Sequence, residues 1–323
     1  MLKINIRKIK QIKSSQKLIQ YLSEMPLLSF LLKLFQRIVL PGFDGLSIYD
    51  VAVFFFKGLV KGSINIRAAS LSYKFYISIF PTIIFLFSII PYVPINGFQD
   101  NLLNLLKNLF PPSIYDLVHD TIFDIIMRQR GGLLSLGFIF ALYFATNGIN
   151  GIIEAFNETY HSIETRSFFK QKLISVFLVF VLTFVVIIAI SLIIGSTALF
   201  NYLESINIIK DSFAYYMILL GKWIIIILML FFGVSSLYYF GPAKKERYRF
   251  ISAGATLATF LFILASIAFN YYIANFSKYN TLYGSIGTLI IILIWINFNA
   301  TILLIGFELN ASINKAKKLK NNN

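Results

Sequence analysis

Polar side chains recur at helical spacing within segments that are otherwise apolar. Arg67, Ser70 and Lys74 form one such set, and Asn147, Asn150 and Glu154 form another. Steps of three and four residues place each set on one face of a helix. Cations on such a face can bind the phosphate of an anionic headgroup, with nearby carboxylates balancing the charge. The candidate substrate-binding residues are Arg67, Ser70, Tyr73, Lys74, Asn147, Asn150, Glu154, Lys222 and Glu308.

The sequence contains no recognisable catalytic motif. The chain has no cysteine and two histidines, and it contains neither an HExxH motif nor a phosphate loop of P-loop spacing. Asp116, Asp120 and Asp124 lie near His119 and resemble a metal-binding set in composition, but their spacing favours the solvated face of an amphipathic helix. We therefore predict no catalytic residues, no metal, no cofactor and no enzymatic activity.

The elements that carry these residues are long uncharged stretches. Of the 323 residues, 58% are hydrophobic and 13% are charged, and the mean hydropathy is +0.76. The uncharged stretches are Phe75–Gln99, Gly131–Ile153, Leu173–Leu203, Trp223–Ala243, Phe250–Ser277 and Tyr279–Phe307. Each is long enough for a helix to cross a bilayer core of about 30 Å, and none alternates as a barrel strand does. The sequence predicts an all-α integral membrane protein with six transmembrane helices.

Shorter amphipathic helices are expected outside these spans. Residues Leu27–Arg37 and a helix opened by the capping box Ser47-x-x-Asp50 are expected to lie in the membrane interface, or else to pack on the bundle. A further amphipathic helix, Ile114–Ile126, is expected in the long loop between the first two spans. We divide the chain into a basic N-terminal segment (residues 1–45), a membrane domain (46–312) and a basic tail (313–323).

The positive charge of the chain indicates its orientation. The formal net charge is +15, and most of the 29 Lys and Arg residues fall in the N-terminal segment, the second and fourth connections and the C-terminal end. The positive-inside rule then places both termini in the cytoplasm. This distribution argues against nucleic-acid binding. The first 66 residues lack the pattern of a secretory signal, so we expect no cleaved signal peptide.

Two interpretations of the intramembrane polar residues remain open. The lysines can be anchors that extend to the nearest headgroups, with the asparagines bridging helices. Alternatively, the polar faces line a cavity that opens to the inner leaflet, where Arg67 or Lys74 pairs with Glu154 or Glu308. Pro81, in the first span, is expected to kink its helix.

Several motifs, in their order along the chain, resemble those of the YihY/BrkB family of bacterial inner-membrane proteins. They are Arg67-Ala68-Ala69-x-Leu71-Ser72-Tyr73 leading to Phe80-Pro81, Ala155-Phe156-Asn157, Tyr283-Gly284-Ser285, Leu293-x-Trp295 and Gly306-x-Glu308-Leu309-Asn310-Ala311. The family was once labelled ribonuclease BN, and this chain has no nuclease constellation. The resemblance implies a role in envelope integrity and in moving lipids from the inner membrane toward the outer membrane.

Together these observations predict a multi-pass protein of the bacterial cytoplasmic membrane that binds or translocates an anionic phospholipid without catalysis. Membrane lipids and periplasmic lipid-transport proteins are the expected partners, and a homo-oligomer is compatible with the sequence but not required by it. Two alternatives stay open. One is a secondary transporter or channel for a small solute, and the other is a scaffold for envelope complexes that transports nothing.

Overall fold

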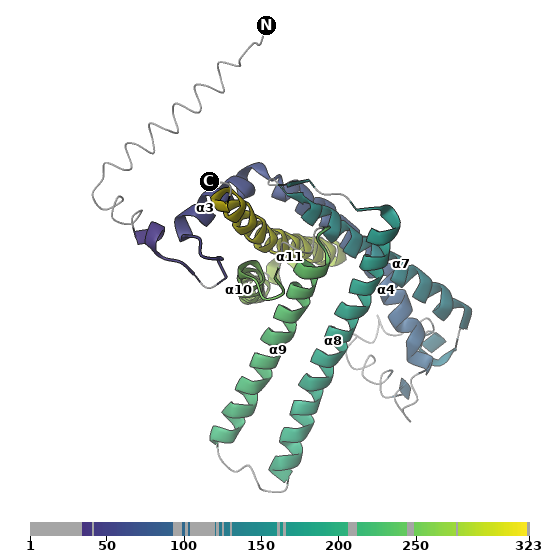
Figure 1. Cartoon of the computed structure of the whole chain (residues 1–323). Coiled ribbons are helices and arrows are strands. Elements are labelled where there is room, and N and C mark those ends of the chain that lie inside the picture. The colour runs from purple at the N-terminus through teal and green to yellow at the C-terminus, as the bar shows by residue number, and fades with distance from the viewer. Residues whose placement is uncertain are drawn as a thin grey trace.

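The computed structural model is built almost entirely of helices (Figure 1). It describes residues 34–40, 42–92, 99–100, 103, 120, 123–124, 126–129, 131–159, 162–163, 166–205, 212–243, 249–275 and 277–321. Its elements are α3 (Ile48–Lys61), α4 (Ile64–Ile89), the 3-10 helix η1 (Ile90–Tyr92), α7 (Gly131–Asn157), β1 (Glu158–Thr159), β2 (Ser162–Ile163), α8 (Phe168–Ser205), α9 (Ser212–Phe240), α10 (Ala253–Asn275) and α11 (Ser277–Asn321). The two strands pair antiparallel, with Glu158 opposite Ile163.

Five helices in the described part of the chain are long and apolar enough to cross a membrane. These candidate spans are Leu134–Asn157, Phe168–Ala189, Leu219–Phe240, Ala253–Tyr272 and Leu289–Lys320. Helix α4, which covers the start of the first predicted span, is not among them. Its 26 residues extend about 39 Å, but Arg67 and Lys74 interrupt their apolar character. The structure therefore supports the helical membrane class, whereas six spans remain a prediction.

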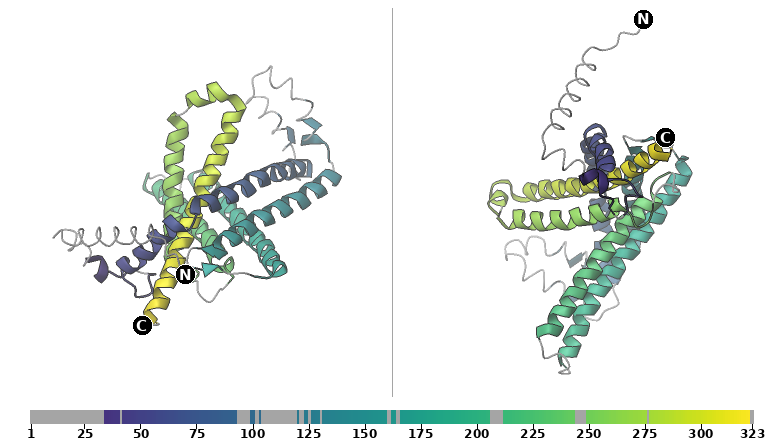
Figure 2. Two further views of the ribbon diagram at one scale, coloured as in Figure 1. Left: turned by 90° about the horizontal axis from the view of Figure 1, so that it is seen from above. Right: turned by 60° about the vertical axis from the view of Figure 1, so that its left-hand side comes forward.

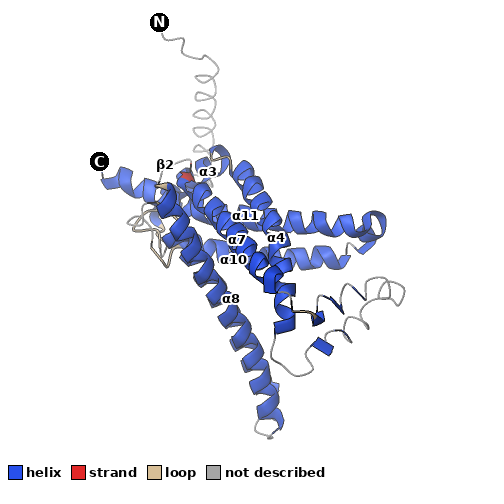
Figure 3. Ribbon diagram, turned by 90° about the vertical axis from the view of Figure 1, so that its right-hand side faces the viewer, coloured by secondary structure: helices blue, strands red, loops and turns tan. Residues whose placement is uncertain are grey.

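The long helices form three hairpins, α4–α7, α8–α9 and α10–α11, which meet at one end of the molecule. The hairpins diverge from this end, as the views in Figures 1, 2 and 3 show. We call the shared end the hub and define it by the buried residues Ile153, Phe156, Leu178, Tyr238 and Phe307. Helices α4, α8 and α10 begin near the hub and α7 and α9 end there, whereas α11 passes through it at Phe307 and continues to Asn321. The described parts of the segments predicted to be cytoplasmic thus lie at the same end.

Aromatic stacking and close backbone contact hold the hub together. The rings of Phe156 and Phe307 stack with their centroids 4.2 Å apart, and Tyr238 packs against both rings. The buried Tyr238 hydroxyl donates a hydrogen bond of 2.6 Å to the carbonyl of Leu303. Helices α10 and α11 cross where Gly254 and Gly306 bring their backbones together, because a Cβ on either glycine would overlap the other residue. These contacts join α7, α9, α10 and α11.

Glycines also set the contact between α4 and α7. Gly148 lies under the Phe75 ring and Gly151 under the Lys74 side chain, at distances that leave little or no room for a Cβ. Helix α4 continues through Pro81, and the kink expected there stays a prediction. The polar faces of the two helices are therefore held in a fixed register.

Helix α3 packs on the end of α11. Ser47 caps it as predicted, by accepting a hydrogen bond from the amide of Asp50. The Asp50 carboxylate accepts from the Ser47 hydroxyl, whereas in a full capping box it would accept from the Ser47 amide. Val51 of α3 is buried with Leu309 and Ile313 of α11. The packing is that of the bundle-bound alternative, although Phe56 and Val60 of α3 remain exposed apolar side chains that suit a membrane interface.

The loop before α3 fastens the C-terminal end of α11. Asp44, which has a positive φ of 53°, pairs with Lys317 at 2.8 Å and with Arg249 at 2.9 Å. Helix α11 runs unbroken across residue 312 to Asn321, so the segment predicted as a basic tail continues the last helix. The division of the chain at residues 45 and 312 stays a prediction. Residues 27–33 and most of the predicted outer amphipathic helix lie outside the described residues.

Candidate functional site

Arg67 and Glu308 form a buried ion pair in the hub. The Arg67 guanidinium lies 3.4 Å from the Glu308 carboxylate, and the two side chains are 9% and 0% exposed. Arg67 also donates a hydrogen bond of 2.7 Å to the carbonyl of Ala155 at the end of α7. Gly58 of α3 lies so close over the Glu308 carboxylate that a Cβ there would overlap it. This pair therefore ties α3, α4, α7 and α11 together.

Lys74 and Glu154 form a second ion pair, which is more exposed. Their charged atoms are 2.8 Å apart, and their side chains are 27% and 46% exposed. Asn150 donates to the other oxygen of Glu154 and accepts from Gln171 of α8, at 2.7 and 2.8 Å. The prediction that Arg67 or Lys74 pairs with Glu154 or Glu308 is thus confirmed, and both cations take part.

The polar face of α7 points away from the hub core. Tyr143, Asn147, Asn150 and Glu154 follow one another at steps of four, three and four residues, and we call this set the α7 polar stripe. Lys172 of α8 lies over it, with its ammonium 5.3 Å from the centroid of the Tyr143 ring. Asn157, three residues after Glu154, is in contrast buried and accepts a hydrogen bond from the amide of Ala243.

The remaining candidate residues lie within the described ranges and make no side-chain hydrogen bond to the two ion pairs. Ser70 and Tyr73 are exposed on α4. On α11, Asn297 donates to Ser72 of α4 at 3.2 Å, so this polar side chain bridges two helices. Lys222 lies on α9, about 24 Å along the helix axis from Tyr238 in the hub. The structure therefore brings the charged candidates together in the hub, apart from Lys222.

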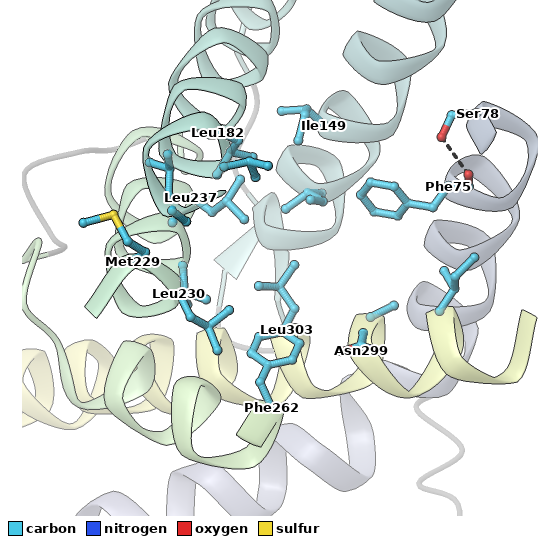
Figure 4. Close-up of a pocket in the computed structure, with 18 of the residues that line it drawn as sticks. Phe75, Ser78, Ile149, Leu182, Met229, Leu230, Leu237, Phe262, Asn299 and Leu303 are labelled. Atoms are coloured by element: carbon cyan, nitrogen blue, oxygen red, sulfur yellow. Dashed lines mark hydrogen bonds between the residues drawn. The ribbon is translucent and has the colours of Figure 1, made fainter. Parts of the chain in front are cut away.

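A large apolar cavity lies between the three hairpins, beyond the hub (Figure 4). Its volume is about 780 Å³, and side chains of α4, α7, α8, α9, α10 and α11 all contribute to its wall. Leu182, Met229, Leu237, Phe262 and Leu303 represent this wall, and the polar side chains in it are Ser78, Thr82 and Asn299. The Ser78 hydroxyl is already used, since it donates to the carbonyl of Phe75.

None of the candidate residues is among those that line this cavity. On α7 the wall is formed by Ile149 and Ile152, and helical geometry places Asn147, Asn150 and Glu154 on the opposite face. The polar faces were predicted to line a cavity, whereas the wall of this cavity is apolar. A set of small residues at membrane depth, such as Ala189, Gly233 and Ala300, was the available signal.

Lys222 is related to the cavity through the face of its helix. Ile226, Met229, Leu230 and Gly233 line the cavity from α9, and Lys222 precedes Ile226 by one helical turn on the same face. The turn corresponds to about 6 Å along the axis, away from the hub. Lys222 thus lies next to the end of the cavity wall that faces the free ends of the hairpins.

In the described ranges, no three His, Cys, Asp or Glu side chains gather as metal ligands would. Asp116 and His119 of the acidic set lie outside those ranges, and Asp124 forms an ion pair with Arg128 at 3.1 Å. The buried carboxylate of Glu308 is used by Arg67. The polar groups in the described part of the hub therefore bind one another.

Fold and site together are those of a helical membrane protein with several apolar spans and an open apolar cavity between its hairpins. The family described as Virulence factor BrkB matches residues 55–323, and the chain belongs to this family. The ribonuclease-like protein YfkH of Bacillus subtilis (strain 168) is 33% identical over 257 residues, which are 80% of this chain and 92% of that protein. A UPF0761 membrane protein of Haemophilus influenzae (strain 86-028NP) is 25% identical over 272 residues, 84% and 97% of the two chains. No solved structure matches the chain.

Proposed function

We propose that this protein binds an anionic phospholipid of the cytoplasmic membrane and moves it between leaflets without chemical catalysis. The observation that carries this proposal is the apolar cavity of about 780 Å³ between the hairpins. Its size lies within the range of about 300–1,000 Å³ that is common for ligand sites. Its wall offers acyl chains an environment like that of the bilayer core. The lipid then passes to periplasmic lipid-transport proteins, as the family resemblance implies.

The lining of the cavity distinguishes a lipid from a small polar solute. Channels and solute transporters line their paths with carbonyls, amides or charged groups that replace the water shell of the solute. Here the polar side chains of the wall are Ser78, Thr82 and Asn299. A hydrated ion or sugar would lose its water without replacement in such a wall, which disfavours the transporter alternative.

Lys222 supplies the preference for an anionic headgroup. A lysine within an apolar helix costs about 2.5–3.5 kcal/mol on insertion scales, and this cost calls for a partner or a function. A lipid whose chains occupy the cavity can place its phosphate near Lys222, because this residue continues the cavity-lining face of α9 by one turn. The substitution Lys222→Gln is expected to reduce the preference for anionic over zwitterionic lipid several-fold.

A cavity-filling substitution tests the proposal. Ala189 lines the cavity from α8, whereas Leu228 of α9 is 55% exposed and does not line it. In vesicles containing a fluorescent phosphatidylglycerol, Ala189→Trp is expected to slow movement between leaflets at least tenfold, and Leu228→Trp is expected to behave as wild type. Equal rates for wild type and both variants would contradict the proposal and favour the scaffold alternative. A proton-gradient-dependent uptake of a polar solute would favour the transporter.

The orientation is part of the proposal, with the hub in the cytoplasm. Because the chain contains no cysteine, single-cysteine variants can be labelled without background. Lys57 of α3 and Lys320 of α11 are exposed, and both lie at the hub end of the molecule. The test variants are Lys57→Cys and Lys320→Cys. In intact cells, a membrane-impermeant maleimide is expected to leave both unlabelled until the membrane is opened. Labelling of either position in intact cells would reverse the proposed orientation.

A further inference from the structure

The α7 polar stripe has no role in a cavity that lies on the other side of α7. The stripe covers 12 residues, from Tyr143 to Glu154, and so extends about 16 Å along a helix that is otherwise apolar. The Tyr143 ring is 54% exposed and the Glu154 side chain 46%. Polar groups on the outer face of a membrane helix are costly, and they typically mark a site for a substrate or ion.

Packing accounts for one end of the stripe only. Near the hub, Glu154 and Asn150 are tied to Lys74 and Gln171, which joins α4, α7 and α8. At the other end, the half-buried Asn147 makes no side-chain hydrogen bond to any described residue. The Asn147 amide is therefore not explained by hydrogen bonds to the described neighbouring helices, and Tyr143 contacts only Lys172 among the described residues of α8.

Lys172 provides an available positive charge at this second end. Its ammonium is held over the Tyr143 ring, and none of the carboxylates in the described ranges lies within ion-pair distance of it. A cation over an aromatic face is held in position but keeps its charge and its donors for an anion. Together with Lys74 and Glu154, the stripe region carries one net positive charge.

We propose that the α7 polar stripe binds the phosphate of a membrane phospholipid headgroup, with Lys172, Tyr143 and Asn147 as its ligands. The single net charge of the region matches one phosphodiester. The Tyr143 hydroxyl, the Asn147 amide and the Lys172 ammonium each supply a donor. The chains of this lipid lie outside the cavity, along the exposed apolar side chains of α7 such as Phe140.

This site is distinct from the cavity, and only its substrate class rests on the proposed function. It lies on the hub side of the molecule, whereas Lys222 lies toward the free ends of the hairpins. The stripe therefore holds a headgroup before or after its passage through the cavity.

Binding of phosphatidylglycerol and of diacylglycerol, measured by native mass spectrometry of the detergent-purified full chain, tests the site. Lys172→Gln is compared with Lys170→Gln, which removes an exposed lysine two residues away on the same helix. We expect Lys172→Gln to weaken phosphatidylglycerol binding about tenfold and Lys170→Gln to leave it unchanged. Tyr143→Leu is expected to weaken it as well, and diacylglycerol, which lacks the phosphate, is not expected to bind the stripe. An excess of inorganic phosphate is expected not to displace the lipid.

Other results would overturn the site. Equal binding by wild type and Lys172→Gln excludes the stripe, and equal losses in the two lysine variants indicate unspecific attraction of charge. Displacement of the lipid by inorganic phosphate identifies a site for the free anion instead. If Ala189→Trp abolishes binding and Lys172→Gln does not, the lipid resides in the cavity, so the stripe proposal fails and the proposed function stands. If Ala189→Trp leaves movement between leaflets unchanged while Lys172→Gln loses the lipid, the stripe stands and the proposed function fails.

Discussion

The substitution Glu308→Gln removes one charge from the ion pair in the hub and keeps the shape of the side chain. At the observed 3.4 Å, and with an effective dielectric constant of about 20, the attraction between Arg67 and Glu308 is about 5 kcal/mol. Removing one partner of a buried pair costs about 3–5 kcal/mol, because the other charge stays buried. The carbonyl of Ala155 still accepts from Arg67 and compensates part of this loss. We expect the free energy of unfolding to fall by about 3–5 kcal/mol.

Reversible unfolding in mixed detergent micelles measures this effect. The matched control is Glu154→Gln, which breaks the partly exposed pair with Lys74 and is expected to cost at most about 1 kcal/mol. The double variant Arg67→Met with Glu308→Met removes both charges and is expected to be more stable than either single variant. A cost for Glu308→Gln no larger than that for Glu154→Gln would refute the argument from burial.

Two further predictions concern the packing of the hub. Gly306→Ala is expected to destabilise the protein by about 1–3 kcal/mol, because its Cβ would overlap the Tyr238 hydroxyl at the crossing of α10 and α11. Gly221→Ala is its control, because a Cβ at this position meets nothing within 4 Å. This variant is expected to stabilise α9 by up to about 1 kcal/mol. Changes in unfolding free energy of the same sign and size in the two variants would contradict the close crossing at Gly306. Tyr238→Phe is expected to cost about 1 kcal/mol through loss of the hydrogen bond to Leu303, and an unchanged unfolding curve would show that this bond contributes nothing.

The uncharged stretches predicted the helices well because a membrane segment has a simple length requirement. The stretch Gly131–Ile153 became α7, Gly131–Asn157, and the stretch Trp223–Ala243 became α9, Ser212–Phe240. The divergence of the hairpins had no such signal, since it depends on where small residues such as Gly254 and Gly306 allow backbones to meet. Small residues in the sequence indicate where two helices come close. The angle at which the helices cross depends on the packing of the whole bundle.

The sequence predicts which charged side chains come together where their depth along the helices alone decides it. Arg67, Lys74, Glu154 and Glu308 share a level, and the structure pairs them. The choice of partners could not be predicted, because it follows from the rotation of α4 between α7 and α11. The same limit applies to Asn157, which has the spacing of the polar stripe. It is buried instead, at the end of α7, where its side-chain oxygen accepts a hydrogen bond from the amide of Ala243.

The contrast between the hub and the hairpins bears on how a lipid could move. The hub is closely packed, with stacked rings, a buried ion pair and a glycine crossing, and a core of this kind resists gradual deformation. The cavity lies beyond it, where the hairpins separate, so under the proposed function a lipid enters there and the hub stays intact. In the proposed path, the headgroup has cationic contacts at the α7 polar stripe and at Lys222, with the apolar wall between them. The crossing of that wall is then the slow step, because no group there replaces the headgroup's water. It follows that Ala189→Trp should slow movement between leaflets while leaving binding at the stripe unchanged.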